Sequence, residues 1–229
     1  MPRIARAVAS ADTSAILTDL GRGARYSIVA LVPVTAAVSI LAPALAKVMF
    51  LGRVDVAGAG LIGTTAAAAA FGLAPFALVM LQMRVFYAAN DTRTPALINL
   101  AMVATKVGAI LIAAATLPAH AVAITLGVAS SLSYLVGATV AHLLLRHRYG
   151  LLGFHHVAAT LRRVGAAAAI AGGCCLAAVV TANAVVSEPR LAALLGLGVG
   201  TTVGLTTFLL AAKAIGIPEL RNARALLVA

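Results

Sequence analysis

Apolar runs long enough to cross a lipid bilayer recur along the whole chain. A bilayer core about 30 Å thick needs roughly 20 apolar residues in a helix. Runs of that length, bounded by charged residues, Pro or Gly, predict six spans, at about 26–50, 56–87, 95–117, 121–145, 164–186 and 189–215. The second run exceeds one span, so we expect its Gly-rich start, Gly58 to Gly63, to form a loop or a separate short turn. The pattern predicts an all-α polytopic membrane protein with six transmembrane helices.

The segments between these runs divide the chain further. Residues 1–25 mix apolar and charged side chains, which suits an amphipathic helix at the membrane interface and equally the tail of an earlier span. Residues 26–149 hold four of the predicted spans, and 150–163 form a basic loop. Residues 164–229 hold the last two spans, as a helix pair, and a tail.

Cations are distributed unequally between alternate loops, and this predicts the orientation. Cytoplasmic loops of membrane proteins retain the excess of Lys and Arg. One side holds twelve, the other holds only Arg53 and Arg190, and cations inside the spans are left out. The twelve are Arg3, Arg6, Arg22, Arg25, Arg93, Arg146, Arg148, Arg162, Arg163, Lys213, Arg221 and Arg224. Both termini are therefore expected in the cytoplasm, with contact to membrane lipids on that side.

Composition excludes several classes of protein. The chain has 229 residues, of which 62% are hydrophobic and 10% charged, with a mean hydropathy of +1.07. A soluble domain carries about 45–50% apolar and about 25% charged residues. The net charge of +11 comes from cations scattered between apolar runs, so it is explained by topology and indicates no nucleic-acid partner. The adjacent Cys174 and Cys175 suit packing within a span better than a disulfide.

Catalytic and metal-binding patterns are not found in the sequence. The six carboxylates fall in flanks or loops, and the glycine-rich stretches lack the Lys-Ser/Thr of a phosphate-binding loop. His147, His155 and His156 lie in the basic loop without Cys or carboxylate at ligand spacing, which favours interfacial loop residues over a metal site. We therefore expect no enzyme, no cofactor and no metal.

Proline and small residues suggest how helices begin, bend and pack. Thr94-Pro95 is a good helix start, because Thr can cap and Pro in the first turn loses no hydrogen bond. Pro33, Pro43 and Pro75 each remove a backbone hydrogen bond within a span, which fits either a functional bend or packing adaptation. Small residues four apart allow close approach of helices, and they predict an antiparallel pair of the fifth and sixth spans. The small residues are Gly196, Gly200 and Gly204 in the sixth span, and Gly165, Ala169 and Gly173 in the fifth.

Two cations lie inside predicted spans, where charge is costly and function is the default hypothesis. Arg84 lies about one turn from the end of its span, so it can extend to the interface, and on a helix it shares a face with Tyr87 and Asp91. Lys106 lies close to the membrane midplane, with Asn99 two turns earlier on the same face. These positions predict that Lys106, Asn99 and Arg84 face a cavity or a substrate.

One segment carries a family resemblance. Gly72-Leu-Ala-Pro-Phe-Ala-Leu is followed by Arg84-Val-Phe-Tyr-Ala-Ala-Asn-Asp-Thr-Arg-Thr-Pro95, and the chain opens with Pro2-Arg-Ile-Ala-Arg. These phrases resemble the MurJ/MviN family of lipid II flippases, and the similarity extends over its spans nine to fourteen. The residues that carry the most specific phrase are Phe86, Tyr87, Asp91, Thr92, Thr94 and Pro95.

The resemblance implies a lobe of a transporter in the multidrug/oligosaccharidyl-lipid/polysaccharide exporter superfamily. Such a protein moves undecaprenyl-pyrophosphate-linked peptidoglycan precursor across the bacterial cytoplasmic membrane by alternating access, and its last two helices form a groove for the polyprenyl tail. The first lobe of the family and its substrate-binding arginines are not in this sequence, so the chain is expected to be a fragment, a truncated gene model or half of a split protein. Two alternatives are a non-transporting membrane scaffold that binds a partner, and another polysaccharide or drug exporter of the superfamily.

The resemblance also bears on Lys106. Family members often place Asn at this position and Asn or Asp four residues later, where some hold a sodium ion. This chain has Lys106 and Ile110, and an ammonium group repels a metal cation. We expect the ammonium to replace the ion, held by Asn99, by the hydroxyl of Thr105 or Thr125, or by backbone carbonyls. The alternative is that Lys106 meets the pyrophosphate directly.

Overall fold

The computed structural model describes residues 13–150 and 155–216, with side chains described from 18 to 150 and from 157 to 216. All regular secondary structure in these ranges is helical. The helices are α2 (Thr13–Phe50), α3 (Val56–Ala70), α4 (Leu73–Ala88), α5 (Arg93–Thr116), α6 (Ala119–Tyr149), α7 (His155–Val185) and α8 (Pro189–Ile215).

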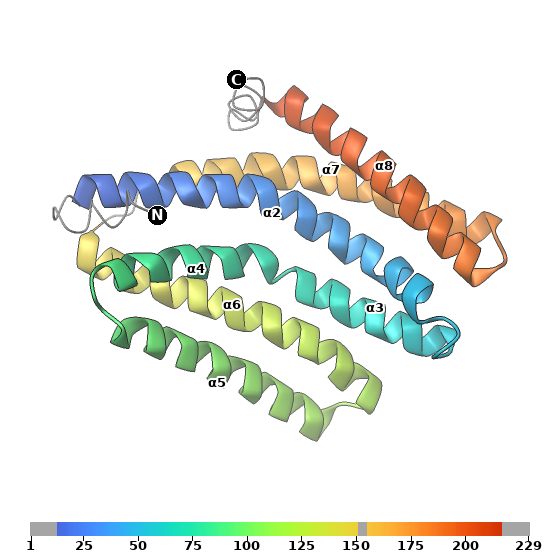
Figure 1. Ribbon diagram of the computed structural model, residues 1–229, viewed down its shortest axis with the longest axis horizontal. Coiled ribbons are helices and arrows are strands. Elements are labelled where there is room, and N and C mark those ends of the chain that lie inside the picture. Colours follow the sequence, from blue (N-terminus) through green and yellow to red (C-terminus); the bar gives the residue numbers. More distant parts are fainter. Residues whose placement is uncertain (1–12, 151–154, 217–229) are drawn as a thin grey trace.

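The helices are long and apolar enough to cross a membrane. Within the described residues, five of them pass this test individually, and α3 with α4 passes it as a pair bent by 41°. The helices run alternately between the two ends of the bundle: α4 and α6 end where α5 and α7 begin, and α2, α5 and α7 end at the opposite side, where α3, α6 and α8 begin (Figure 1). This confirms the predicted all-α polytopic membrane protein and allows up to six spans.

The described parts of two predicted boundary segments are largely helical. The part of 1–25 that the structure describes, from Thr13 on, is continuous with α2, and Leu20 and Ala24 are buried against other helices. Burial against protein accounts for Leu20 and Ala24, whereas the side chains of residues 1–17 lie outside the described residues. The basic loop expected at 150–163 was wrong beyond its first residues, because α7 begins at His155.

The second apolar run breaks in a different place from the one we expected. The Gly58 to Gly63 segment is part of α3, whose start is capped by the Asp55 carboxylate, which accepts a bond of 2.9 Å from the Gly58 N–H. Gly63 lies within this helix where α2 packs directly on it, and only glycine fits there because a Cβ would overlap the backbone of Pro43. The break instead falls at residues 71–72, between α3 and α4, with Pro75 in the first turn of α4. The expectation of a loop at Gly58 to Gly63 was therefore wrong.

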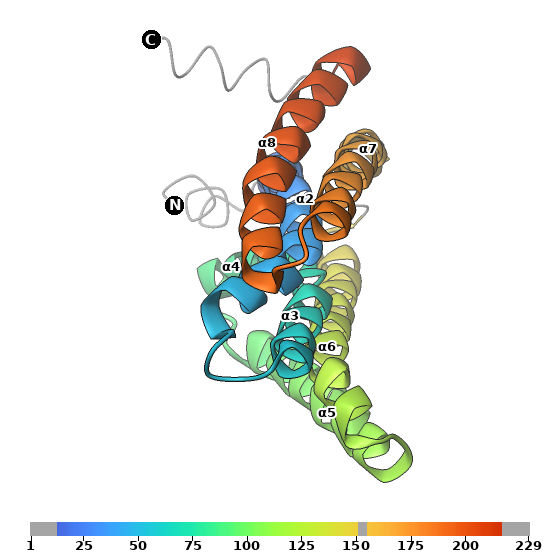
Figure 2. The ribbon, with the colours of Figure 1, turned by 90° about the vertical axis from the view of Figure 1, so that its right-hand side faces the viewer.

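The buried residues form two clusters. The first joins α4, α5 and α6 and one turn of α2 with large side chains, among them Met83, Phe86 and Leu145. The second joins α2, α7 and α8 and contains many alanines, with Phe208 as its largest member. Figure 2 shows the same division, with α7 and α8 on one side of α2 and the α5–α6 pair on the other. Helix α5 lies at the outer edge, packed mainly on α6 (Figures 1 and 2).

Candidate functional site

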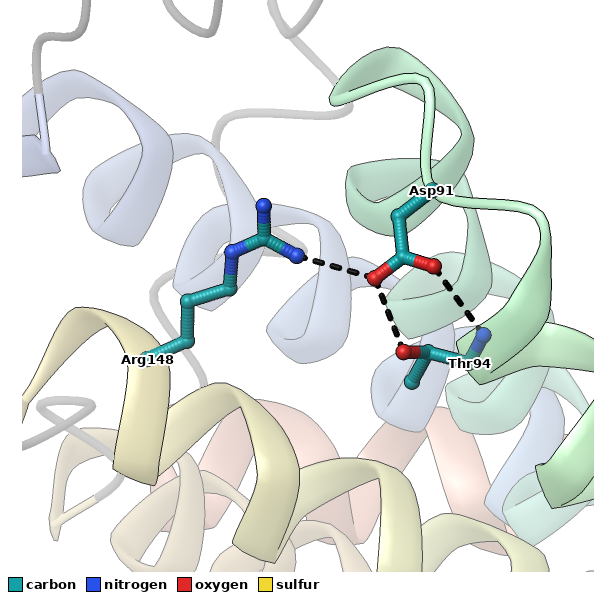
Figure 3. Close-up of polar contacts among 3 residues, drawn as sticks. All are labelled: Asp91, Thr94 and Arg148. Atoms are coloured by element: carbon teal, nitrogen blue, oxygen red, sulfur yellow. Dashed lines mark hydrogen bonds and ion pairs between the residues drawn. The ribbon is translucent and has the colours of Figure 1, made fainter.

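The turn between α4 and α5 is organised by Asp91. Its Oδ1 accepts a bond of 3.0 Å from the backbone N–H of Thr94, and its Oδ2 accepts one of 2.8 Å from the Thr94 hydroxyl. Arg148, in the last turn of α6, donates to the same Oδ2 from Nη1 at 2.9 Å (Figure 3). Asp91, rather than Thr94, therefore satisfies the free backbone donor at the start of α5, and our expectation of a Thr94 cap was wrong.

The remaining residues of the family phrase are placed on both sides of this turn. Phe86 and Pro95 are buried, whereas Tyr87 is about half exposed. Thr92 is the exposed residue that immediately precedes α5. Asn90 has a φ of 55°, a left-handed conformation that Asn tolerates better than most residues. The phrase thus builds a tight, capped turn that is fastened to α6.

The surroundings of Asp91 stabilise its charged form. The hydrogen bonds from the Thr94 N–H and hydroxyl, followed by the bond and charge of Arg148, lower the pKa of this carboxyl below its ordinary value of 3.8. Asp91 is therefore ionised over the whole neutral range and carries the charge that Arg148 meets. Sequence reasoning missed Arg148, which had been counted only as a loop cation.

Lys106 and Asn99 lie on the exposed surface of α5. Both side chains are exposed, and Lys106 makes no hydrogen bond or ion pair within the described part of the chain. Thr105 and Thr125 donate their hydroxyls to Ala101 O and Ala121 O, each at 2.8 Å, and their oxygens could still accept a bond. Neither accepts one from Lys106 in this part of the chain, so the expected contact with the ammonium is not found there.

Arg84 is also exposed, on α4, and Tyr87 is exposed one turn further along. The predicted third member of this face, Asp91, lies beyond the end of α4 and is bound to Thr94 and Arg148. Helix α5 has few contacts with α4 beyond the turn that joins them. The exposed polar groups of the two helices are therefore available to further partners.

An apolar groove lies between α2, α7 and α8, with a volume of about 190 Å³. It is bordered on α2 by Pro33, Ala37 and Leu41, on α7 by Ala171 and Cys175, and on α8 by Gly200, Gly204 and Phe208, among others. Small residues on α7 and α8 leave this space open. Such a lining suits a hydrocarbon chain better than a polar ligand.

The glycine face of α8 lies against α7. A Cβ at Gly196 would be 3.6 Å from Val179, one at Gly200 3.0 Å from Val179, and one at Gly204 3.2 Å from Cys175. The matching α7 face differs from the predicted one. Gly165 and Gly173 have no such neighbours, and the buried residues of α7 that lie next to the α8 glycines are instead Ala171, Cys175 and Val179. The residues predicted on α7 have the four-residue spacing of a contact face, but they lie on a different side of the helix from the one that meets α8.

Metal ligands do not gather in the part of the chain that the structure describes: it holds no group of three His, Cys, Asp or Glu side chains. The side chains of His155 and His156 lie outside the described residues.

The arrangement comprises an apolar groove, exposed cations on apolar helices and a capped turn, which together suit an amphiphilic, anionic ligand. The family model described as "Lipid II flippase MurJ" matches residues 1–210 of the chain. This match covers all seven described helices except the last turns of α8. The chain belongs to the MurJ family of lipid II flippases.

Proposed function

We propose that this chain forms the C-terminal lobe of a transporter that flips undecaprenyl-pyrophosphate-linked peptidoglycan precursor across the bacterial cytoplasmic membrane by alternating access. Family membership supports the substrate class and a transport function without catalytic chemistry. The twelve-to-two distribution of cations that flank the predicted spans supports cytoplasmic termini.

The observation that carries the proposal is the unpaired Lys106 near the middle of α5. A charged side chain at this depth is costly unless it meets water, a counter-charge or a polar cavity. The side chain is exposed, and its neighbours on the exposed surface of α5 include Leu100, Val103 and Val107. A pyrophosphate passing along α5 would supply the missing negative charge, and Asn99 and Arg84 would add polar contacts.

The groove between α2, α7 and α8 would hold the other end of the same substrate. A polyprenyl chain is apolar and unbranched except for methyl groups, so it fits a narrow lining of Ala, Gly, Leu and Phe side chains. Headgroup and tail would then contact different regions of the lobe. This division matches the two chemistries of a lipid-linked sugar.

A second lobe would complete the transport path. The exposed polar groups on α4 and α5 supply one wall for an anionic headgroup, and alternating access requires an opposing wall that moves relative to it. We propose that this partner is an N-terminal transporter lobe, carried on the same polypeptide or on another.

Substitution of Lys106 tests the proposal. In bacteria depleted of their own flippase, a transporter that contains this lobe with Lys106→Met should lose most of its ability to sustain growth. Lys213→Met is the matched control, because Lys213 is exposed in the last turn of α8, where the interface solvates it.

Growth of the Lys106→Met and Lys213→Met variants can support or overturn the proposal. Loss with Lys106→Met and retention with Lys213→Met, at equal membrane abundance, support a substrate-facing lysine. Full growth with Lys106→Met would leave α5 as a lipid-facing scaffold and would overturn the proposal.

A further inference from the structure

Helices α3 and α4 are separated by a break at residues 71–72, which we call the elbow (Figure 1). The elbow interrupts the helical hydrogen bonds within an apolar segment of the chain. The Gly72 N–H bonds to Ala69 O at 3.0 Å, whereas in a regular α-helix it would bond to Ala68 O. Pro75 has no N–H to offer Phe71 O, its partner in a continuous helix. The bent form therefore leaves Ala68 O without its helical donor, and a continuous helix would leave Phe71 O without one.

Helix α6 supplies that donor to the bent form. The Ser131 hydroxyl donates to Ala68 O at 2.7 Å and lies 3.3 Å from Ala69 O. Packing reinforces this contact, because a Cβ at Gly72 would lie 2.8 Å from the Tyr134 ring and 3.0 Å from Ser131 Cα. The Phe76 and Tyr134 rings are 4.9 Å apart.

Ser131 behaves differently from every other Ser and Thr residue of its helix. Helix α6 contains five Ser and Thr residues, and four of them donate to a carbonyl three or four residues earlier in α6. These four are Thr125, Ser130, Ser133 and Thr139. Only Ser131 reaches across to another helix. The carbonyl of Gly127, four residues earlier, offers Ser131 the same intrahelical acceptor.

Two hydrogen-bond patterns for Ala68 O and the Ser131 hydroxyl are therefore available. In the bent pattern, Ala68 O accepts from Ser131. In a straighter pattern, Ala68 O accepts from the Gly72 N–H, and Ser131 turns back to Gly127 O. Each pattern satisfies Ala68 O and the Ser131 hydroxyl, so the element has two discrete arrangements rather than a continuous range.

We propose that the elbow is a two-state joint and that the Ser131 hydroxyl is its latch, bound to Ala68 O in the bent state and to Gly127 O in the straighter one. The joint gives this lobe a place to flex between its α3 and α4 ends. The inference concerns the helices themselves and holds whichever substrate the protein carries.

Fluorine NMR of the full chain in lipid nanodiscs tests the joint. A fluorinated phenylalanine replaces Phe71, whose ring is 61% exposed and lies at the elbow itself. The spectrum should contain a major resonance from the bent state and a minor one from the straighter state. Ser131→Ala removes the latch and should raise the ratio of minor to major resonance by roughly three- to tenfold, the effect of one interhelical hydrogen bond in a membrane.

Two further variants make the result decisive. Pro75→Ala restores the N–H that a continuous helix needs and leaves Ser131 intact, so it should raise the same ratio. Ser130→Ala removes a neighbouring hydroxyl that bonds only to Leu126 O, and it should leave the ratio unchanged. The proposal is overturned if one resonance persists unchanged in all variants, or if Ser130→Ala shifts the ratio as much as Ser131→Ala does.

Discussion

Two parts of the bundle are held together by different means. In the part formed by α3 to α6, large side chains of α4, α5 and α6 interlock, Ser131 of α6 bonds to α3, and Arg148 of α6 pairs with Asp91 in the α4–α5 turn. Around α2, α7 and α8, small residues allow close packing, and a groove remains open between the helices. A bilayer supplies no hydrophobic force between helices, so close packing and polar contacts must both be used. The first region is built to hold a defined bend, and the second to keep a space for a chain.

Among the variants that test this difference, Gly127→Ala should change the stability of the protein most. A Cβ there would overlap the Thr65 carbonyl oxygen and crowd Ala69 N, both part of α3 backbone that cannot turn away. Gly127→Ala should therefore destabilise the protein by about 1–3 kcal/mol. Unfolding in mixed micelles, followed by circular dichroism, measures this change.

Gly196→Ala is the matched control in the second region. Its Cβ would lie 3.6–3.8 Å from Val179, which is ordinary contact, so the change in stability should stay within about 0.5 kcal/mol. Equal losses for the two variants would contradict the contrast between a tightly locked region and a more tolerant one.

A smaller effect, on transport rather than folding, is expected in the groove. Ala37→Phe places a ring in the space between α2, α7 and α8 and should lower transport severalfold at unchanged stability, because the substrate chain loses its site. Val38→Phe, at the next and exposed position of α2 outside the groove lining, should transport normally. If the Ala37→Phe variant transports at the same rate as the Val38→Phe variant, the groove does not hold the substrate.

The smallest effect is the dependence of stability on pH through Asp91. Its pKa is lowered by folding, so its stabilising contribution is fully present above the ordinary value of 3.8 and is lost as pH falls through the folded pKa. Asp91→Asn should therefore be less stable than the wild type at pH 7, and the difference should shrink as the pH falls below 4. A difference that stays constant down to pH 2 would mean that the carboxylate charge contributes nothing.

The helices could be predicted from hydropathy, but their contacts could not. Spans follow from composition over about 20 residues, and each of the six predicted runs coincides with a helix or, for 56–87, with the α3–α4 pair, although α2 and α7 begin earlier than predicted. The elbow was misplaced because Gly58 to Gly63 and Gly72 are equally permissive locally, and only packing on Pro43 and on Tyr134 distinguishes them. Asp91 and Arg148 are 57 positions apart, so no local pattern could pair them.

Transport by the purified lobes tests the central claim most directly. Vesicles that contain fluorescent lipid II are reconstituted with this chain alone, with an N-terminal family lobe alone, or with both, and the fraction that reaches the outer leaflet is measured with a membrane-impermeant quencher. We predict rapid transfer with both lobes, little with either alone, and a strong reduction when the pair carries Lys106→Met. Transfer by this chain alone at the rate of the pair would contradict the account.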